Sequence, residues 1–319
     1  MTTTQEAEKP RISFSQLGSW NRCEQAWDYS YKQGFRPQEQ KPYFALGGTG
    51  HEMMAEYYSN KKNKPSMTVG ELLEAHLLFV QKLLSEADSS QLKTITRAAW
   101  LMQHYIAEYS PIEDQGHTIV EIEHELIVPL TSPNGLEYEL IGIIDLLTSR
   151  QGRFWLWDHK FTGRFWNPIQ ALMDSQMPMY CAALRATGRD VFGIIINMVN
   201  TYDYKKPQEQ TPDKLFRREK TYRTAHELDS VLFHVGLSVE RKWEAQTNPN
   251  WTPIRSLNKD CDRCAFQEPC LFEIKGIDAA PILRAKYAKK EHHQTTNDPV
   301  SGGGTLRIIA PELYASEDE

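Results

Sequence analysis

Three strands joined by two short turns constrain the fold of this chain more than any other feature. Apolar and polar residues alternate over residues 117–130, and the tetrapeptide Ser132-Pro133-Asn134-Gly135 follows, which is typical of a tight turn. Residues 136–148 and 153–161 supply two further strands, separated by Gln151-Gly152. The sequence therefore predicts an antiparallel three-stranded meander.

Helical patterns surround this meander. Apolar spacing predicts helices over residues 45–58, 69–85 and 92–109, and a further helix over residues 167–187 followed by a buried strand over residues 191–199. We expect one α/β domain over residues 1–275, with a helical part (1–116), an αβ core (117–200) and a helical part (201–275). Residues 276–319 are polar and end in Glu-Asp-Glu, so we expect a mobile tail.

Composition excludes several classes of protein. Of the 319 residues, 40% are hydrophobic and 24% charged, which excludes a wholly disordered or fibrous chain. No apolar run approaches the roughly 18 residues of a spanning helix, and the polar start shows no secretory signal, so we expect a soluble cytoplasmic protein without membrane contact. The net charge of −6 disfavours a non-specific nucleic-acid coat protein but not an enzyme that binds divalent cations. The basic stretch 205–223 is either a solvated loop or part of a nucleic-acid path.

Candidate catalytic residues lie on the second and third strands. Asp145 belongs to the second strand. On the third strand, the even-numbered residues 154–160, which include Asp158 and Lys160, share one face, and the odd-numbered residues 155–161 share the other. Carboxylates on adjacent strands can ligate Mg²⁺ or Mn²⁺, and the lysine can act on water or phosphate, although an Asp–Lys pair at the surface is the alternative. His51, after a glycine-rich segment, can add a nitrogen ligand that favours Mn²⁺, or can be a structural histidine.

Two further groups carry chemistry. Gln176 and Tyr180 share one helix face, which suits contact with a nucleic-acid strand or packing against the sheet. Four cysteines suit a [4Fe–4S] cluster or a structural zinc, and their spacing does not choose between the two: Cys23, Cys261, Cys264 and Cys270. The fifth, Cys181, is expected to be a small buried apolar residue.

In chain order these residues match a known pattern. The array of His51, Gly142-x-x-Asp145, Asp158-x-Lys160 and Gln176-x-x-x-Tyr180 resembles the RecB-like branch of the PD-(D/E)XK nucleases. With Cys23 and Cys261-x2-Cys264-x5-Cys270, the chain is similar to the iron–sulfur exonucleases of the CRISPR-associated RecB-like family and to AddB-type nucleases. The resemblance spans residues 13–272.

The resemblance implies a fold and residue roles. The fold would be a restriction-endonuclease-like core (helix, three-strand meander, helix, strand) with helical flanks closed by a four-cysteine metal centre holding a [4Fe–4S] cluster. Lys160 would be the catalytic lysine, and Gln176 and Tyr180 would position DNA. Four groups would bind Mg²⁺ or Mn²⁺: His51, Asp145, Asp158 and the backbone carbonyl of His159. Many CRISPR-associated members have Glu in place of Asp158. Of Glu121, Glu123 and Glu125, one can touch the metal or the lysine, but we expect an exposed strand face.

The implied activity is that of a metal-dependent DNA exonuclease, chiefly on single strands and in the 5′ to 3′ direction, in recombination, repair or replication. The chain has no Gly-x4-Gly-Lys-Ser/Thr phosphate loop, so a helicase, recombinase or integrase partner would supply DNA ends unless the nuclease stands alone. Two alternatives are a CRISPR adaptation nuclease that trims new spacers and a non-catalytic iron–sulfur module that binds DNA ends.

Overall fold

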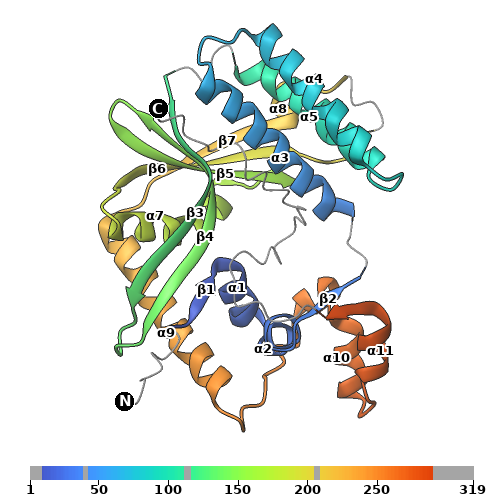
Figure 1. Ribbon diagram of the computed structural model, residues 1–319. Helices are drawn as coiled ribbons and strands as arrows, with labels where there is room; N and C mark the ends of the chain where they lie inside the picture. Colours follow the sequence, from blue (N-terminus) through green and yellow to red (C-terminus); the bar gives the residue numbers. More distant parts are fainter. Residues whose placement is uncertain (1–8, 39–41, 111–115, 205–208, 290–319) are drawn as a thin grey trace, which may run out of the picture.

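A six-stranded mixed sheet forms the centre of the molecule (Figure 1). The computed structural model describes residues 9–38, 42–110, 116–204 and 209–289. The strand order is β1-β4-β5-β6-β7, and β3 pairs with the other edge of β4. Only the β1–β4 and β5–β6 pairs are parallel. The strands are β1 (Arg11–Ser13), β3 (Thr118–Thr131), β4 (Glu137–Arg150), β5 (Arg153–Thr162), β6 (Val191–Asn200) and β7 (Phe216–Thr221).

The predicted meander is confirmed as β3, β4 and β5, and β4 has an unusual set of neighbours. On one side β4 pairs with β3 along almost its whole length. On the other side β1 pairs with residues 139–141 and β5 with residues 146–150. Residues 142–145 therefore fall between two neighbouring strands, which leaves a break in the sheet beside Asp145.

Helices cover both faces of the sheet (Figure 1). On one face α7 (Gln176–Ala186) and α9 (Ala225–Thr247) pack on the strands and form the first core cluster. On the other face α3 (Pro42–Asn63), α4 (Val69–Glu86) and α5 (Leu92–Tyr109) form the second core cluster. As the alternation predicted, Leu156 of β5 enters the first cluster, whereas Trp155 and Trp157 enter the second.

A smaller body joins the two ends of the described chain. It contains α1 (Phe14–Arg22), α2 (Glu24–Trp27), a π-helix (Asp28–Lys32), a 3-10 helix (Lys259–Arg263), α10 (Gln267–Ile274) and α11 (Ala280–Lys286). Tyr29, Phe266 and Tyr287 form the centre of a third core cluster in this body. Strands β2 (Phe35–Pro37) and β8 (Tyr287–Lys289) pair antiparallel beside it.

The structure corrects three expectations. The helix predicted over residues 167–187 is two helices, α6 (Pro168–Leu172) and α7, because the Asp174 carboxylate accepts a hydrogen bond from the Met177 backbone at 2.8 Å and starts a new helix. The part expected to be helical after residue 200 contains β7, which pairs with the buried β6. A tail starting at residue 276 is wrong for residues 280–289, because Leu283 and Tyr287 are buried in the third cluster. Residues 290–319 lie outside the described part.

None of the described helices combines the length and the apolarity that a bilayer crossing requires.

Gly142 allows close packing of α7 on the sheet. A Cβ atom at this position would lie 2.6 Å from the Tyr180 hydroxyl oxygen and 2.7 Å from a ring carbon. We expect Gly142→Ala to lower the free energy of unfolding by about 1–3 kcal/mol, because the buried Tyr180 must shift. Gly18→Ala is the control, since a Cβ there meets nothing within 4 Å. Urea unfolding measures both, and a Gly142→Ala chain as stable as the wild type would contradict the packing.

Lys242 of α9 carries a buried amine. Its side chain is 3% exposed, and Nζ donates to Gln246 Oε1 at 2.7 Å. Burial lowers the pKa of Lys242 to about 8, against about 10.4 for an unfolded chain. The folded state therefore binds fewer protons than the unfolded state between these two values, and stability rises with pH across this window.

We expect Lys242→Met to raise the free energy of unfolding by ~1–3 kcal/mol at neutral pH, where the wild type must bury an ammonium. The gain should shrink as the pH rises above 8, because the wild-type amine is then neutral in the folded chain. Urea titrations at neutral pH and at about pH 10 measure this, with the exposed Lys82→Met as control. A gain of equal size at both pH values would show that burial of the charge has no cost.

Candidate active site

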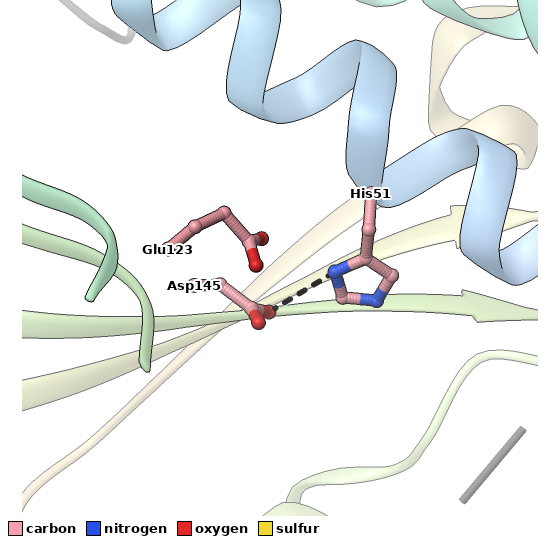
Figure 2. A group of neighbouring side chains, drawn as sticks. All are labelled: His51, Glu123 and Asp145. Atoms are coloured by element: carbon pink, nitrogen blue, oxygen red, sulfur yellow. Dashed lines mark ion pairs between the residues drawn. The ribbon is translucent and has the colours of Figure 1, made fainter. Parts of the chain in front are cut away.

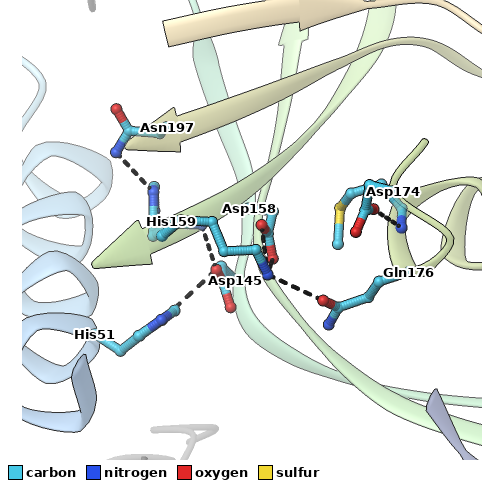
Figure 3. Close-up of polar contacts among 9 residues, drawn as sticks. His51, Asp145, Asp158, His159, Asp174, Gln176 and Asn197 are labelled. Carbon is cyan, nitrogen blue, oxygen red and sulfur yellow. Dashed lines mark hydrogen bonds and ion pairs between the residues drawn. The ribbon is translucent and has the colours of Figure 1, made fainter. Parts of the chain in front are cut away.

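Four elements bring the predicted catalytic residues together where the sheet breaks (Figure 3). His51 comes from α3 and Asp145 from β4, while Asp158 and Lys160 come from β5 and Gln176 begins α7. The site thus combines groups that lie up to 125 residues apart, from His51 to Gln176.

Asp145 connects α3 to β5. Its Oδ2 atom accepts a hydrogen bond from the His159 backbone N–H at 2.6 Å and lies 3.6 Å from His51 Nδ1. Burial raises the pKa of Asp145, and the negative charge of Asp158 adds to this, whereas His51 and Lys160 oppose it. An added positive charge would therefore stabilise the ionised form of Asp145.

Lys160 forms an ion pair with Asp158. Its Nζ atom lies 2.9 Å and 2.8 Å from the two Asp158 carboxylate oxygens and donates to Gln176 Oε1 at 3.0 Å. Burial by itself lowers the pKa of Lys160, but the charge and hydrogen bond of Asp158 outweigh it, so the pKa is raised. Lys160 is therefore a protonated donor, and Asp158 and Gln176 fix the position of its ammonium group.

Tyr180 is buried between α7 and the sheet. Its side chain is 4% exposed and packs against Gly142, so its ring offers no face for stacking on a nucleobase. Burial raises the pKa of Tyr180 to about 12, although a hydrogen bond with Gln176 opposes the shift. Tyr180 thus supports Gln176, which in turn holds Lys160. Because α7 packs its Tyr180 face on the sheet, Tyr180 fits the packing role that the sequence offered as the alternative to contact with nucleic acid.

The His159 side chain lies on the face of the sheet that α3 covers, where a buried network holds it. The sequence analysis did not predict this network. The His159 ring stacks on Tyr58 with an interplanar angle of 3°, and its Nδ1 atom accepts from the Asn197 amide at 2.9 Å. Asn197 Oδ1 accepts in turn from the Tyr105 hydroxyl and from Arg218 Nε, each at 3.2 Å. Burial lowers the pKa of His159 well below its usual value, so the ring is neutral. The sequence signal for this network was Asn197, a polar residue within the apolar run 191–199.

Part of the basic stretch belongs to this network. The Arg218 guanidinium lies 3.7 Å from the centroid of the Tyr109 ring and 4.9 Å from that of Trp157. Arg218 therefore packs into the structure from β7, whereas Arg217 is exposed. Residues 205–208 of the stretch lie outside the described residues.

A candidate metal site lies around Asp145. One ligand atom each from His51, Glu123 and Asp145 can be chosen so that all three lie within 4.8 Å of one another (Figure 2). Carboxylate oxygens and an imidazole nitrogen suit Mg²⁺ and, more strongly, Mn²⁺. The structure thus brings His51 and Asp145 together and places Asp158 next to Lys160. It also brings Glu123 to this group, whereas the sequence analysis expected Glu123 to lie on an exposed strand face.

The four cysteines lie in the smaller body. Cys23 separates α1 from α2, Cys261 and Cys264 lie in and after the 3-10 helix, and Cys270 lies in α10. Burial raises the pKa of the Cys264 thiol, and the neighbouring Cys23 and Cys261 thiols add to the shift. No three cysteines of the described chain have sulfur atoms within 4.8 Å of one another. Cys181 is buried in the first core cluster, as predicted.

The chain is similar to one sequence family and to solved structures of other proteins. Among curated proteins, none matches the chain. The solved structure of SSO0001 has 11% identity over 82% of this chain and 87% of its own, with a TM-score of 0.34. A Eubacterium rectale protein provisionally named an exonuclease has 16% identity over 82% of this chain and 90% of its own, with a TM-score of 0.46. Residues 11–271 match the family model of the PD-(D/E)XK nuclease superfamily. The chain therefore belongs to the PD-(D/E)XK nuclease superfamily.

Proposed function

We propose that this chain is a metal-dependent DNA exonuclease of the RecB-like branch, acting chiefly on single strands in the 5′ to 3′ direction in recombination, repair or replication. One observation carries the catalytic part of the proposal. The Lys160 ammonium is held by Asp158 and Gln176 beside the pair formed by His51 and Asp145. A lysine and three metal-binding side chains in one place are the groups that hydrolysis of a phosphodiester needs.

The residues have distinct roles in this proposal. His51, Asp145 and Asp158, with the backbone carbonyl of His159, would hold Mg²⁺ or Mn²⁺. When bound, such a cation lowers the pKa of a coordinated water and offsets charge on the phosphate. Lys160 donates to a phosphate oxygen, where its positive charge stabilises the negative charge that develops during attack. Gln176 accepts a hydrogen bond from the ammonium and so helps to keep it in place.

We expect Lys160→Met to reduce cleavage of DNA at least about 100-fold, because one donor to a developing oxyanion is lost. The assay uses single-stranded DNA with Mn²⁺ or Mg²⁺ and protein purified without oxygen. Lys82→Met, an exposed change on α4, is the control and should cleave at the wild-type rate. Wild-type activity in Lys160→Met would exclude Lys160 from the reaction.

The form of the substrate tests the exonuclease proposal separately. Closed circular single strands should remain intact, because an exonuclease requires an end, and linear strands should be degraded. With a 5′ label, short labelled products should appear first, whereas a 3′ label should remain on long fragments until late. Cleavage of circles would indicate an endonuclease. No cleavage of any substrate by the intact protein would favour the non-catalytic DNA-end-binding module.

The proposal includes a [4Fe–4S] cluster on Cys23, Cys261, Cys264 and Cys270. Three of these, Cys23, Cys264 and Cys270, border the same third core cluster, and Cys23 influences the pKa of both Cys264 and Cys270. Sulfur atoms around one zinc, at about 2.3 Å from it, would all lie within roughly 4 Å of one another. No three cysteine sulfur atoms of the described chain lie that close together, and a [4Fe–4S] cluster does not require them to, because each thiolate binds a different iron atom.

We expect Cys264→Ala to lose its iron, from about four atoms per chain to nearly none, and to melt at a lower temperature, because cluster binding is coupled to folding of the smaller body. Iron and sulfide analysis of anaerobically purified protein measures the loss. Cys181→Ala removes a buried thiol from the main core and should keep its iron. Equal iron content in the two variants would contradict the cluster proposal. One zinc per chain in the wild type would show that the four cysteines bind zinc instead.

A further inference from the structure

We propose that Glu123 is a metal ligand, and that with His51 and Asp145 it forms a side-chain set that binds the divalent cation. This inference rests on the proposed function, since it adds a ligand to the same site. It reverses the sequence-based expectation that Glu123 belongs to an exposed acidic face.

The register of the sheet places Glu123 opposite Asp145. Ile122 pairs with Leu146 and His124 with Ile144, so Glu123 and Asp145 occupy the same rung of the β3–β4 ladder. Side chains on one rung of an antiparallel pair lie side by side. His51 reaches this rung from α3, and a ligand atom of each of the three residues lies within 4.8 Å of the other two. Figure 2 shows both carboxylates and the imidazole directed to one point.

Glu123 interrupts the regular alternation of β3. Its φ of 46° lies in the left-handed region, which glutamate rarely adopts. On the two sides of this residue, Ile122 packs into the second core cluster and Leu126 into the first, although a regular strand would direct both to one face. The strand therefore reverses its faces here, and the local backbone conformation directs the carboxylate toward Asp145.

The neighbouring acids on β3 have other surroundings. Glu121 Oε1 accepts from Arg189 Nη1 at 2.6 Å, and Glu125 is exposed. Asp158, the other carboxylate of the site, is paired with the Lys160 ammonium. Glu123 therefore brings the second carboxylate to the group that already contains Asp145. Two carboxylate oxygens offset the charge of a divalent cation, and the imidazole nitrogen favours Mn²⁺ over Mg²⁺.

The test measures binding of Mn²⁺ alone to the cluster-loaded protein by isothermal titration calorimetry. Glu123→Asn removes the charge but introduces a residue that tolerates a positive φ better than glutamate does. We expect Glu123→Asn to weaken Mn²⁺ binding about tenfold or more, because a ligand is lost. Its stability to urea without metal should equal or exceed that of the wild type. Loss of affinity without loss of stability separates a ligand from a merely structural residue.

Glu125→Asn is the matched control: it removes the same charge two residues away on the same strand and should bind Mn²⁺ like the wild type. Glu123→Asp provides a second variant, which keeps the charge but withdraws the carboxylate by one methylene, and we expect intermediate affinity. Mn²⁺ binding unchanged in both Glu123 variants would overturn the inference.

Failure of the inference and failure of the proposed function give different results. A wild-type protein that degrades DNA, together with unchanged Mn²⁺ affinity in Glu123→Asn, would refute the role of Glu123 alone. A wild-type protein that binds Mn²⁺ through Glu123 but cleaves no DNA would refute the nuclease and leave the metal site standing.

Discussion

The hydrogen bond from the His159 backbone to the Asp145 carboxylate is the contact on which the site depends. It joins β4 to β5 at the point where regular pairing between these strands ends, next to the break that separates β5 from β1. Because the Asp145 side chain receives this bond, its carboxylate is fixed beside His51. The same stretch of β5 places Asp158 and Lys160 on the face of α7 and the His159 ring on the face of α3. Strand β5 thus contributes residues to both faces of the sheet.

The site is a concentration of negative charge around the half-buried ammonium of Lys160. Asp145 and Asp174 have raised pKa values, chiefly because burial disfavours their ionised forms, while Asp158 keeps Lys160 protonated. Buried carboxylates close together repel one another, and a divalent cation relieves this repulsion. A site of this kind favours metal binding through its electrostatics.

Packing behind the site explains why its motifs contain residues with no direct chemistry. Gly142 admits the Tyr180 ring, Tyr180 bonds to Gln176, and Gln176 accepts from Lys160. On the opposite face, Tyr58 and Asn197 hold the His159 ring. The glycine and the glutamine–tyrosine pair of the motif therefore form a continuous chain of contacts that ends at the Lys160 ammonium.

Local sequence determined much of this protein. Turn residues and a period of two fixed the three strands, and the same period correctly separated Leu156 from Trp155 and Trp157. The motif residues Asp145, Asp158, Lys160, His51 and Gln176 could be named because, taken in chain order, they resemble the motif array of a known nuclease family. The sequence did not predict the helix break between residues 172 and 176 or the pairing of residues 216–221 with β6. Both depend on partners that compete with helix propensity only in the folded chain: a side-chain cap in the first case and a neighbouring strand in the second.

Tertiary structure alone decided which acids meet. Glu121, Glu123 and Glu125 are equivalent in an alternating pattern, and only the reversal of β3 at Glu123 directs one of them to Asp145 while Glu125 remains exposed. It also decided that Tyr180 is buried and that residues 280–289 complete the smaller body. The physical reason is common to these cases. A side chain's direction on a regular element follows from its sequence position, but its direction at an irregularity, and its burial against a distant element, follow from packing of the whole chain.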